Sequence, residues 1–490
     1  MNFFSLGLRN LLLRKWRTAL LLAGYGLGVA TMIVLLSIGE ALVLQASDEK
    51  LIGGGNITVL PEGIDVEVMK TGGLGGMFFS IDHSRFIHRQ LLAAPRLETV
   101  VAAAAPQITG KLLYVIAGSR VIPVLASGEI PSLSSAVGAA PRIVAGEWSD
   151  ADADRRWASP TARELRDEID HFHVPPTEVR GDSTWAEWHY FNVLWPGGNK
   201  WAFVSFIVGG AVPGGRWGGQ VLVTLHEVGQ PVRRFVSNQL PAAVSFSTTH
   251  ADVRIGGSSV SVMQDGRYRA LIRAVEEGTG SPLKMDVEIA PSPNAFFPGA
   301  ALGGSAVVSG YVVPALRADA TGRVCVGRKC EMLESVQSYH DHNWGVWRDV
   351  AWEWGEARAG GYTLLYGRLL AAGVADQPLF LYIVDSLGFV GLFRPKKIDY
   401  TDGRTVMVDG RAVRVPSHAM MSDVRGADAV TIELDIDDAA ATDTRRSAGS
   451  RPGSLGGRYF VQLKGSARLT GRIAGRPLSG TGQGFFETYR

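Results

Sequence analysis

The side chains best suited to chemistry lie in one stretch of sixteen residues, Tyr339 to Trp354, which reads Y-H-D-H-N-W-G-V-W-R-D-V-A-W-E-W. In an extended strand, side chains alternate between two faces. One face then carries His340, His342 and Trp344, and the other carries Tyr339, Asp341 and Asn343. Titratable groups beside indole rings are typical of an apolar ligand pocket with a few polar contacts. A buried polar network that only fixes barrel geometry would use the same residue types, and both interpretations stay open.

Histidines offer two further groupings. His340 and His342 share a strand face and could both bind a metal ion, but the sequence shows no third ligand. His171 and His173 flank Phe172 near a predicted helix end, with no cysteine or carboxylate pair at ligand spacing. We expect these two histidines at the surface, and we assign the chain neither a metal nor a cofactor.

Composition limits the classes of protein that the chain can belong to. The 490 residues include 49 basic and 47 acidic side chains, so the net charge of +2 gives no basic footprint for nucleic acid. A hydrophobic content of 46% allows several cores at about 150 residues per domain. The 60 glycines and 23 prolines indicate many short strands joined by turns.

The N-terminus predicts a membrane anchor. Residues 18–39 carry no charge, and a helix of that length rises about 33 Å, enough to cross a hydrocarbon core of about 30 Å. Arginine and lysine precede this segment and acidic residues follow it, which places the N-terminus in the cytoplasm and the bulk of the chain outside. A cleavable signal peptide is the alternative, but its apolar region would be only about 7–15 residues long. We expect a single-pass protein of the cell (inner) membrane.

The elements that must position the candidate residues come next along the chain. Residues 51–178 predict a small extracytoplasmic α/β domain, with a strand at 56–60, a helix at 84–92 and a hairpin formed by 112–116 and 120–126. A second helix, 160–172, has Ser159 as its expected N-cap. From residue 181 onward, short strands separated by Gly, Asn, Asp and Pro turns predict an antiparallel barrel or sandwich. Asp437 to Gly457 is expected to form a loop.

The two cysteines, Cys325 and Cys330, bracket the sequence Val326-Gly-Arg-Lys329. With Gly327-Arg328 as a two-residue hairpin turn, the cysteines lie opposite each other on neighbouring strands, close enough for a disulfide. An extracytoplasmic location would allow the bond to form. A disulfide and two free thiols both remain open, whereas two cysteines are too few for a structural zinc site.

Residues 181–490 resemble the carotenoid 1,2-hydratase and AttH-like family. The motifs that carry the resemblance are E-W-H-Y-F-N (187–192), Y-H-D-H-N-W-G (339–345), W-x-W-G (352–355) and the closing G-x-G-F-F-E. The resemblance implies a mainly β fold with two tandem lipocalin-like antiparallel barrels, 179–345 and 346–490, and a ligand space between them. The whole chain is then one transmembrane helix within residues 1–50, the small α/β domain and the two barrels.

The hydratase branch of this family matches the chain at His342 and Trp344, with Tyr366 in its Tyr-x-Asp pair. Here the Asp is replaced by Arg368. Protonating an alkene requires an acid, and a guanidinium does not release its proton near neutral pH. The substitution therefore weighs against hydratase activity.

The N-terminus resembles a different family. Residues 6–20, the apolar helix and residues 54–63 are similar to ABC permeases of the MacB type, in which the first transmembrane helix leads into an extracytoplasmic domain. A further group of three C-terminal helices, found in such permeases, is not evident in this sequence. The resemblance implies ABC transporter subunits as partners.

Two functional classes remain open. The first is a membrane-anchored protein that binds a hydrophobic or amphiphilic small molecule, accessory to ABC export. The second is a cofactor-free hydratase or cyclase, in which His342 is the acid or base while Trp344 and Tyr366 shape the cavity. The ligand-binding candidates are Trp188, Tyr190, Tyr339, Asp341, Asn343, Trp352, Trp354 and Arg368.

Overall fold

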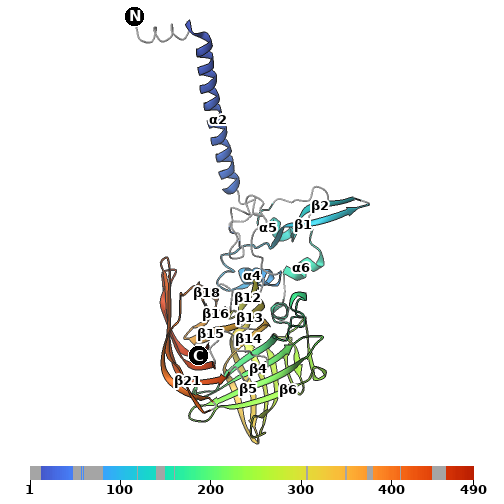
Figure 1. The fold of residues 1–490 in the computed structure, drawn as a ribbon, viewed down its shortest axis with the longest axis vertical. Helices are drawn as coiled ribbons and strands as arrows, with labels where there is room; N and C mark the ends of the chain where they lie inside the picture. Colours follow the sequence, from blue (N-terminus) through green and yellow to red (C-terminus); the bar gives the residue numbers. More distant parts are fainter. Residues whose placement is uncertain are drawn as a thin grey trace. The chain divides into compact units, whose positions relative to one another are not determined.

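The computed structural model describes residues 13–47, 57, 59, 81–118, 120–139, 149–158, 161–304, 307–347, 350–371, 379–408, 410–443 and 459–490. The chain divides into two compact units. The first comprises Met1–Ser80 and Ala102–Arg156, and the second comprises Ile81–Val101 and Trp157–Arg490. The predicted fold class is confirmed, because two antiparallel sheets dominate the second unit behind an apolar N-terminal helix (Figure 1).

The first unit contains the helix α2 (Lys15–Ser47) and a hairpin of β1 (Gln107–Ala117) and β2 (Arg120–Glu129). This is the hairpin that the sequence predicted around Gly118. The short helix α5 (Pro131–Ala136) follows it, and α6 (Asp152–Ala158) begins in the same unit. The strand expected at 56–60 lies almost entirely outside the described residues.

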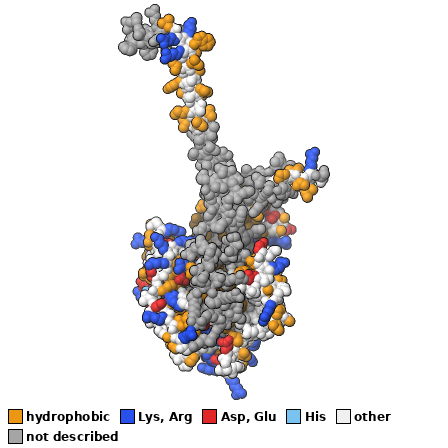
Figure 2. Space-filling view, viewed as in Figure 1, with side chains coloured by type: hydrophobic (Ala, Val, Ile, Leu, Met, Phe, Trp, Pro, Cys, Tyr) orange, Lys and Arg blue, Asp and Glu red, His pale blue; other side chains and the backbone are white. Residues whose placement is uncertain are grey.

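The helix α2 has the length and composition of a membrane span. Its segment Lys15–Ser37 has 23 residues and a mean hydropathy of 2.2, and within the described part of the chain it is the one helix that meets both conditions. On the side visible in Figure 2, most of the coloured side chains of this helix are hydrophobic. Length and apolar character agree with the expected anchor, and the direction of insertion stays a prediction.

The first sheet has twelve strands, and eight of them close into an antiparallel barrel. Around the barrel the order is β11 (Pro282–Pro291), β13 (Val307–Val326), β14 (Lys329–Val346), β3 (Trp185–Leu194), β4 (Lys200–Gly210), β5 (Trp217–Glu227), β6 (Arg233–Gln239) and β10 (Tyr268–Glu276). Pairing of β10 with β11 completes the ring. The strands outside the ring are β7 (Val244–Phe246), β8 (Val253–Ile255), β9 (Ser258–Val262) and β12 (Phe297–Gly304).

The second sheet is a nine-stranded antiparallel sheet that begins directly after β14. Its order is β18 (Gly388–Phe393), β17 (Phe380–Asp385), β16 (Tyr362–Ala371), β15 (Val350–Ala359), β23 (Arg476–Tyr489), β22 (Tyr459–Ile473), β21 (Asp428–Asp443), β20 (Arg411–Arg425) and β19 (Asp399–Val408). A hydrogen bond from Arg425 on β20 to the carbonyl of Leu392 on β18 links its two margins. The expected loop 437–457 is wrong in its first part, because β21 continues to Asp443, and residues 444–458 lie outside the described residues.

Two helices pack with the sheets of the second unit. They are α4 (Ile81–Ala93), which matches the predicted helix 84–92, and α7 (Ala162–Ile169); two short 3-10 turns, Thr177–Val179 and Pro241–Ala243, also belong here. The expected domain 51–178 is therefore shared between the two units. The predicted N-cap Ser159 is wrong. The α7 N-cap is Thr161, because its hydroxyl accepts from the Glu164 backbone while the Glu164 carboxylate accepts from the Thr161 backbone.

Among its described residues, the second unit has three large hydrophobic cores and a smaller cluster around Phe86 and Phe296. One fills the barrel, and a second covers one face of the nine-stranded sheet. The third lies between the two sheets, because it draws Tyr190, Trp201 and Tyr339 from the barrel and Leu365 and Phe485 from the second sheet. In these strands successive side chains point alternately into two different environments, which explains why the strands could be predicted from the sequence.

The cysteines lie across the turn between β13 and β14, in the predicted register. Cys325 is paired with Cys330, their Cα atoms are 4.0 Å apart, and the two sulfur atoms form a disulfide. Gly327 has φ +60°, a conformation that the tight turn requires and that glycine adopts without strain.

Candidate functional site

The two faces of strand β14 carry different side chains, and one face points into the barrel while the other points into the core between the sheets. It pairs with β3 so that His342 lies opposite His189 and Asp341 lies opposite Tyr190. His340 and His342 are fully buried on the barrel side, whereas Tyr339 belongs to the core between the sheets. The alternation predicted from the sequence therefore holds, and it separates two polar clusters.

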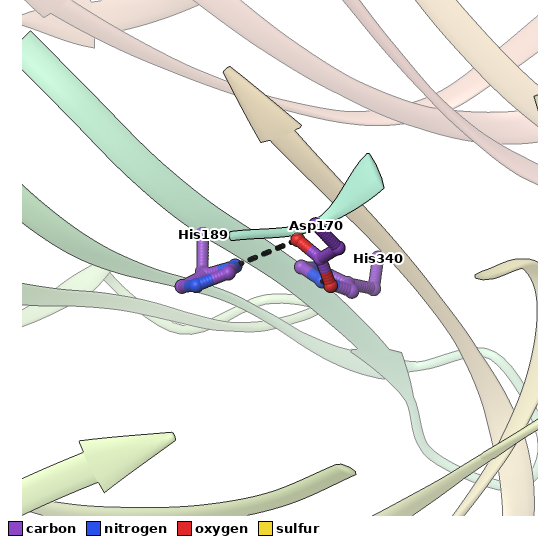
Figure 3. A group of neighbouring side chains, drawn as sticks. All are labelled: Asp170, His189 and His340. Atoms are coloured by element: carbon purple, nitrogen blue, oxygen red, sulfur yellow. Dashed lines mark hydrogen bonds and ion pairs between the residues drawn. The ribbon is translucent and has the colours of Figure 1, made fainter. Parts of the chain in front are cut away.

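The cluster inside the barrel is built around Asp170, the residue that ends α7. Its carboxylate accepts hydrogen bonds from the Tyr268 hydroxyl and from His342 Nδ1, the latter at 2.7 Å. His340 Nε2 lies 3.3 Å from Asp170 Oδ2, and His189 Nδ1 lies 3.5 Å from Oδ1. Figure 3 shows the carboxylate between the rings of His189, from β3, and His340, from β14.

A second carboxylate extends this cluster. Glu187 Oε1 lies 3.0 Å from His342 Nε2 and 2.8 Å from His173 Nδ1. The His173 ring stacks on Trp344, with 3.8 Å between ring centroids. The expectation that His173 lies at the surface holds only in part, because its side chain is 25% exposed while the Glu187 carboxylate accepts from its backbone N–H and hydrogen-bonds its ring.

The titratable side chains of this cluster differ in how strongly they hold a proton. Burial lowers the pKa of His342, but hydrogen bonds to Asp170 and Glu187 more than offset this and raise it to about 9. Burial and the neighbouring His342 lower the pKa of His189 well below its usual value. Burial raises the pKa of Asp170, yet the imidazoles around it hold that pKa well below its usual range. His342 is therefore an imidazolium between two carboxylates near neutral pH.

The other face of β14 contributes to what we call the inter-sheet site. It is formed by β3, β14, β15 and β23, and its members are Trp188, Tyr190, Asn192, Tyr339, Asp341, Asn343, Trp347, Trp352, Trp354, Glu356 and Glu487. Tyr339 donates to Asp341 Oδ2 at 2.8 Å and accepts from Trp354 Nε1 at 2.9 Å. Asn343 donates to Asp341 Oδ1 at 2.6 Å. All but one of the predicted ligand-binding residues lie here, on the two sheets that face each other.

Three carboxyl groups share the inter-sheet site; Asp341 and Glu356 are buried and Glu487 is partly buried. Burial raises the pKa of Asp341 to about 8 and that of Glu356 to about 8, and it also raises the pKa of Glu487. Asn192 donates to Glu356 Oε1 at 3.2 Å, and Trp352 Nε1 donates to Glu487 Oε2 at 2.8 Å. With pKa values of about 8, Asp341 and Glu356 keep at neutral pH a proton that an exposed carboxyl would lose, and they can act as proton donors.

Indole rings form one wall of the inter-sheet site. The ring centroids of Trp188 and Trp347 are 4.7 Å apart, those of Trp347 and Trp352 are 5.9 Å apart, and those of Trp188 and Trp352 are 6.4 Å apart. All three indole side chains are partly exposed, whereas the carboxyl groups of Asp341 and Glu356 are buried. Aromatic surface that remains open in an otherwise closed core is available to a ligand.

The structure does not bring the predicted catalytic residues together. His342 is in the barrel cluster and Trp344 packs against it, whereas Tyr366 lies in the core on the other face of the second sheet, where its ring contacts Phe486. Arg368 also points away from the inter-sheet site and forms an ion pair with Glu353, the residue opposite it on β15. Arg368 therefore does not pair with Asp341 of the inter-sheet site.

Sequence reasoning missed several residues of both clusters. Asn192 and Glu487 end two of the motifs that carry the family resemblance, and Glu356 continues the alternation after Trp352 and Trp354. These positions were therefore readable as members of one strand face. Asp170 was not, because only the course of the chain after α7 places it inside the barrel.

Two surface cavities lie away from both clusters. One of about 700 Å³ is lined by the β3–β4 turn, β14 near Gln337, and Lys464 and Gln483 of the second sheet. The other, about 510 Å³, lies near Lys200 and Arg233 at one end of the barrel. Neither is lined by His342 or Asp341, so neither defines the candidate site.

Comparison with known proteins gives a limited result. The sequence matches no family model and no curated protein. Among solved structures, it is similar to an AttH-like protein from Nitrosomonas europaea, with 18% identity, a TM-score of 0.44, and coverage of 65% of this chain and 98% of the other. CghA with Sch210972 gives 14% identity, a TM-score of 0.42 and coverage of 65% and 97%. Kievitone hydratase from Nectria haematococca gives 12% identity, a TM-score of 0.40 and coverage of 66% and 94%. A likeness at this level does not decide the chemistry of this chain.

Proposed function

We propose that this chain binds an apolar or amphiphilic small molecule at the inter-sheet site. The observation that carries the proposal is the group of three mutually contacting indoles, Trp188, Trp347 and Trp352, which stay partly exposed between two sheets. Rings of this size bury large apolar areas on a ligand at a small entropic cost. The proposed class is lipid-like or isoprenoid-like.

The polar groups of the site favour a ligand with few charges. Glu356 is buried, and burial raises its pKa to about 8, so it faces the ligand as a neutral O–H donor at pH 7. A hydroxyl or carbonyl oxygen on an otherwise apolar molecule would accept that hydrogen bond. A ligand carboxylate would have no described cation to pair with among the residues named for the inter-sheet site.

We propose that residues 18–39 tether the protein to the cell membrane with the sheets on the extracytoplasmic side. The charge asymmetry around this segment supports the direction. ABC export subunits are the proposed partners, on the N-terminal resemblance to permeases. Crosslinking in intact cells tests the partner: recovery of ABC subunits with the chain is expected, and their absence from the crosslinked products contradicts it.

Organic extraction of the purified full-length chain, followed by mass spectrometry, tests the ligand proposal. A defined apolar molecule is expected in the wild-type extract and in Trp217→Ala, because Trp217 packs on the barrel core instead. Trp352→Ala is expected to retain at least about tenfold less, since a central aromatic contact is worth about 2 kcal/mol. Equal retention by both variants, in folded protein, contradicts binding at the inter-sheet site.

A second function, acid catalysis, is favoured by the placement of Glu356 on the same strand face as Trp352 and Trp354. A protonated carboxyl can transfer its proton to an alkene carbon, forming a C–H bond and a carbocation that the indole faces stabilise. Addition of water, or of a second alkene within the molecule, then releases a proton that returns to the carboxylate. The reaction class is hydration or cyclisation, and it requires no redox partner.

Glu356→Gln separates binding from catalysis. The amide keeps an oxygen that accepts from Asn192 but has no proton to give. With the extracted molecule or an isoprenoid alkene as substrate, catalysis predicts loss of product by at least about a hundredfold with retained binding, in the range of general acid effects. Product formation at the wild-type rate excludes Glu356 as the acid.

A further inference from the structure

Inside the barrel, a histidine nitrogen faces a carboxylate oxygen, and what holds the two atoms together depends on the tautomer and charge of the ring. His340 Nδ1 lies 2.9 Å from the backbone carbonyl of Tyr190. A carbonyl oxygen only accepts, so this nitrogen carries the hydrogen. In the neutral ring the lone pair is then on Nε2, which faces Asp170 Oδ2 at 3.3 Å. Two lone pairs that face each other require a proton or a cation between them.

His189 gives a second, independent observation at the same carboxylate. Its side chain is fully buried, and within the described residues neither ring nitrogen has a hydrogen-bond partner of ordinary geometry. The backbone of Ala251 is close enough for a weak hydrogen bond with the ring, although its geometry is poor, and Nδ1 is 3.5 Å from Asp170 Oδ1. A buried imidazole without a satisfied nitrogen is costly unless something binds it.

The spacing of these atoms fits one ion. Ligands about 2.0–2.2 Å from a tetrahedral ion lie roughly 3.3–3.6 Å from one another. The separation of 3.3 Å from His340 Nε2 to Asp170 Oδ2 and that of 3.5 Å from His189 Nδ1 to Asp170 Oδ1 both fall in this range, and they involve the two oxygens of one carboxylate. The candidate ligand atoms of Asp170, His189 and His340 all lie within 4.8 Å of one another. We propose that these three side chains bind a divalent transition-metal ion of the Zn²⁺ class.

The surrounding residues are arranged as supports for metal ligands. Tyr268 and His342 both donate to the Asp170 carboxylate and fix its orientation, and the Tyr190 carbonyl fixes the tautomer of His340. Such outer hydrogen bonds are the usual companions of metal-binding histidines and carboxylates. The sequence showed no third ligand beside the histidines of β14, because Asp170 and His189 come from α7 and β3.

The donor set selects the class of ion. Two imidazoles and one carboxylate suit Zn²⁺ and its neighbours among the transition metals, whereas Ca²⁺ and Mg²⁺ require mostly oxygen ligands. Bound there, the ion ties the end of α7 to two barrel strands, β3 and β14. This site is separate from the inter-sheet site and does not depend on the proposed ligand function.

Metal analysis of the full-length protein, dialysed against metal-depleted buffer with added Zn²⁺ and then freed of excess, tests the proposal. One tightly held Zn²⁺ per chain is expected, with removal by a chelator lowering the melting temperature. Asp170→Asn and His189→Gln should each weaken Zn²⁺ binding by at least a hundredfold. Tyr268→Phe, which removes only a supporting hydrogen bond, should weaken it by about 10- to 100-fold.

His418→Gln is the matched control, because this histidine lies on the surface beside Asp435 and should leave Zn²⁺ binding unchanged. If the variants of buried residues do not fold, titration of the wild-type protein with Co²⁺ tests metal binding without them. Visible absorption bands of a four- or five-coordinate Co²⁺ complex, abolished by competing Zn²⁺, are expected. A wild-type protein that retains no Zn²⁺ and gives no such bands overturns the proposal and leaves an imidazolium–carboxylate network. Unchanged metal content in folded His189→Gln overturns it as well.

Discussion

Replacing Glu356 by Gln should remove much of the pH dependence of stability between about pH 4.5 and pH 8. This carboxyl is buried between the two sheets with one described hydrogen bond, from Asn192, and burial raises its pKa from 4.5 to about 8. In the unfolded chain the proton leaves near pH 4.5, whereas in the folded chain it stays until about pH 8. The stabilising contribution is therefore fully present below pH 4.5 and is lost as the pH rises through about 8.

The size of the effect follows from the difference in proton affinity. Each tenfold difference in proton affinity is worth about 1.4 kcal/mol, so the whole change is on the order of 5 kcal/mol, an upper value because neighbouring groups respond. At pH 9 Glu356→Gln should be more stable than the wild type by up to that amount. At pH 4 the two should be nearly equal, since the amide oxygen still accepts from Asn192.

Urea denaturation of the full-length protein in detergent, from pH 4 to pH 9, measures the effect. Circular dichroism and tryptophan fluorescence must give the same transition for the free energies to be comparable. The matched control is Glu433→Gln, an exposed position on the same sheet that lies 3.9 Å from Arg468 and should not change the pH profile. Parallel stability curves for the wild type and Glu356→Gln would refute the assignment of a protonated carboxyl at this position.

The remaining predictions concern the ion pair, the disulfide and the topology. Arg368→Ala should lower the free energy of unfolding by about 1–3 kcal/mol, because Glu353 loses this ion pair, and ligand retention should equal that of the wild type. A tenfold loss of ligand with unchanged stability would instead support Arg368 as a ligand-binding residue, as the sequence suggested. Exported protein should give no alkylated thiol before reduction, and quantitative alkylation without reductant would show free thiols instead. The double variant Cys325→Ser, Cys330→Ser should lower the free energy of unfolding by no more than about 2–3 kcal/mol. Protease added to intact spheroplasts should digest the sheets while residues 18–39 stay protected, and full protection of the sheets would contradict the predicted direction of insertion.

Strand periodicity made much of the fold predictable. Alternating rows such as those of β3 and β14 specify both the strand and its faces, and the turn between Cys325 and Cys330 fixed its own register. The ends of helices were harder to predict from the sequence. Ser159 before a proline resembles a cap, but Thr161 and Glu164 form the reciprocal pair that starts α7, because only that pair satisfies both backbone donors.

The residues of the candidate site that share a face of one strand could be predicted from the sequence, but their partners on other strands could not. The contents of both faces of β14 could be read from alternation, but their partners depend on which strands neighbour it. Tyr366 was assigned to the site of His342 on family resemblance, yet it faces the core on the other side of the second sheet. Asp170 lies far from β14 in sequence and reaches His342 only through the course of the chain after α7.

Tyr190 belongs to both polar clusters at once. Its backbone carbonyl fixes the ring of His340 inside the barrel, and its hydroxyl makes a hydrogen bond with Glu487 between the sheets. A movement of the backbone at Tyr190 would therefore shift a group in each cluster. If a ligand between the sheets moves this backbone, thermodynamic linkage requires that occupancy of each cluster change the affinity of the other by the same factor, and coupling of this kind is typically worth about 1–3 kcal/mol.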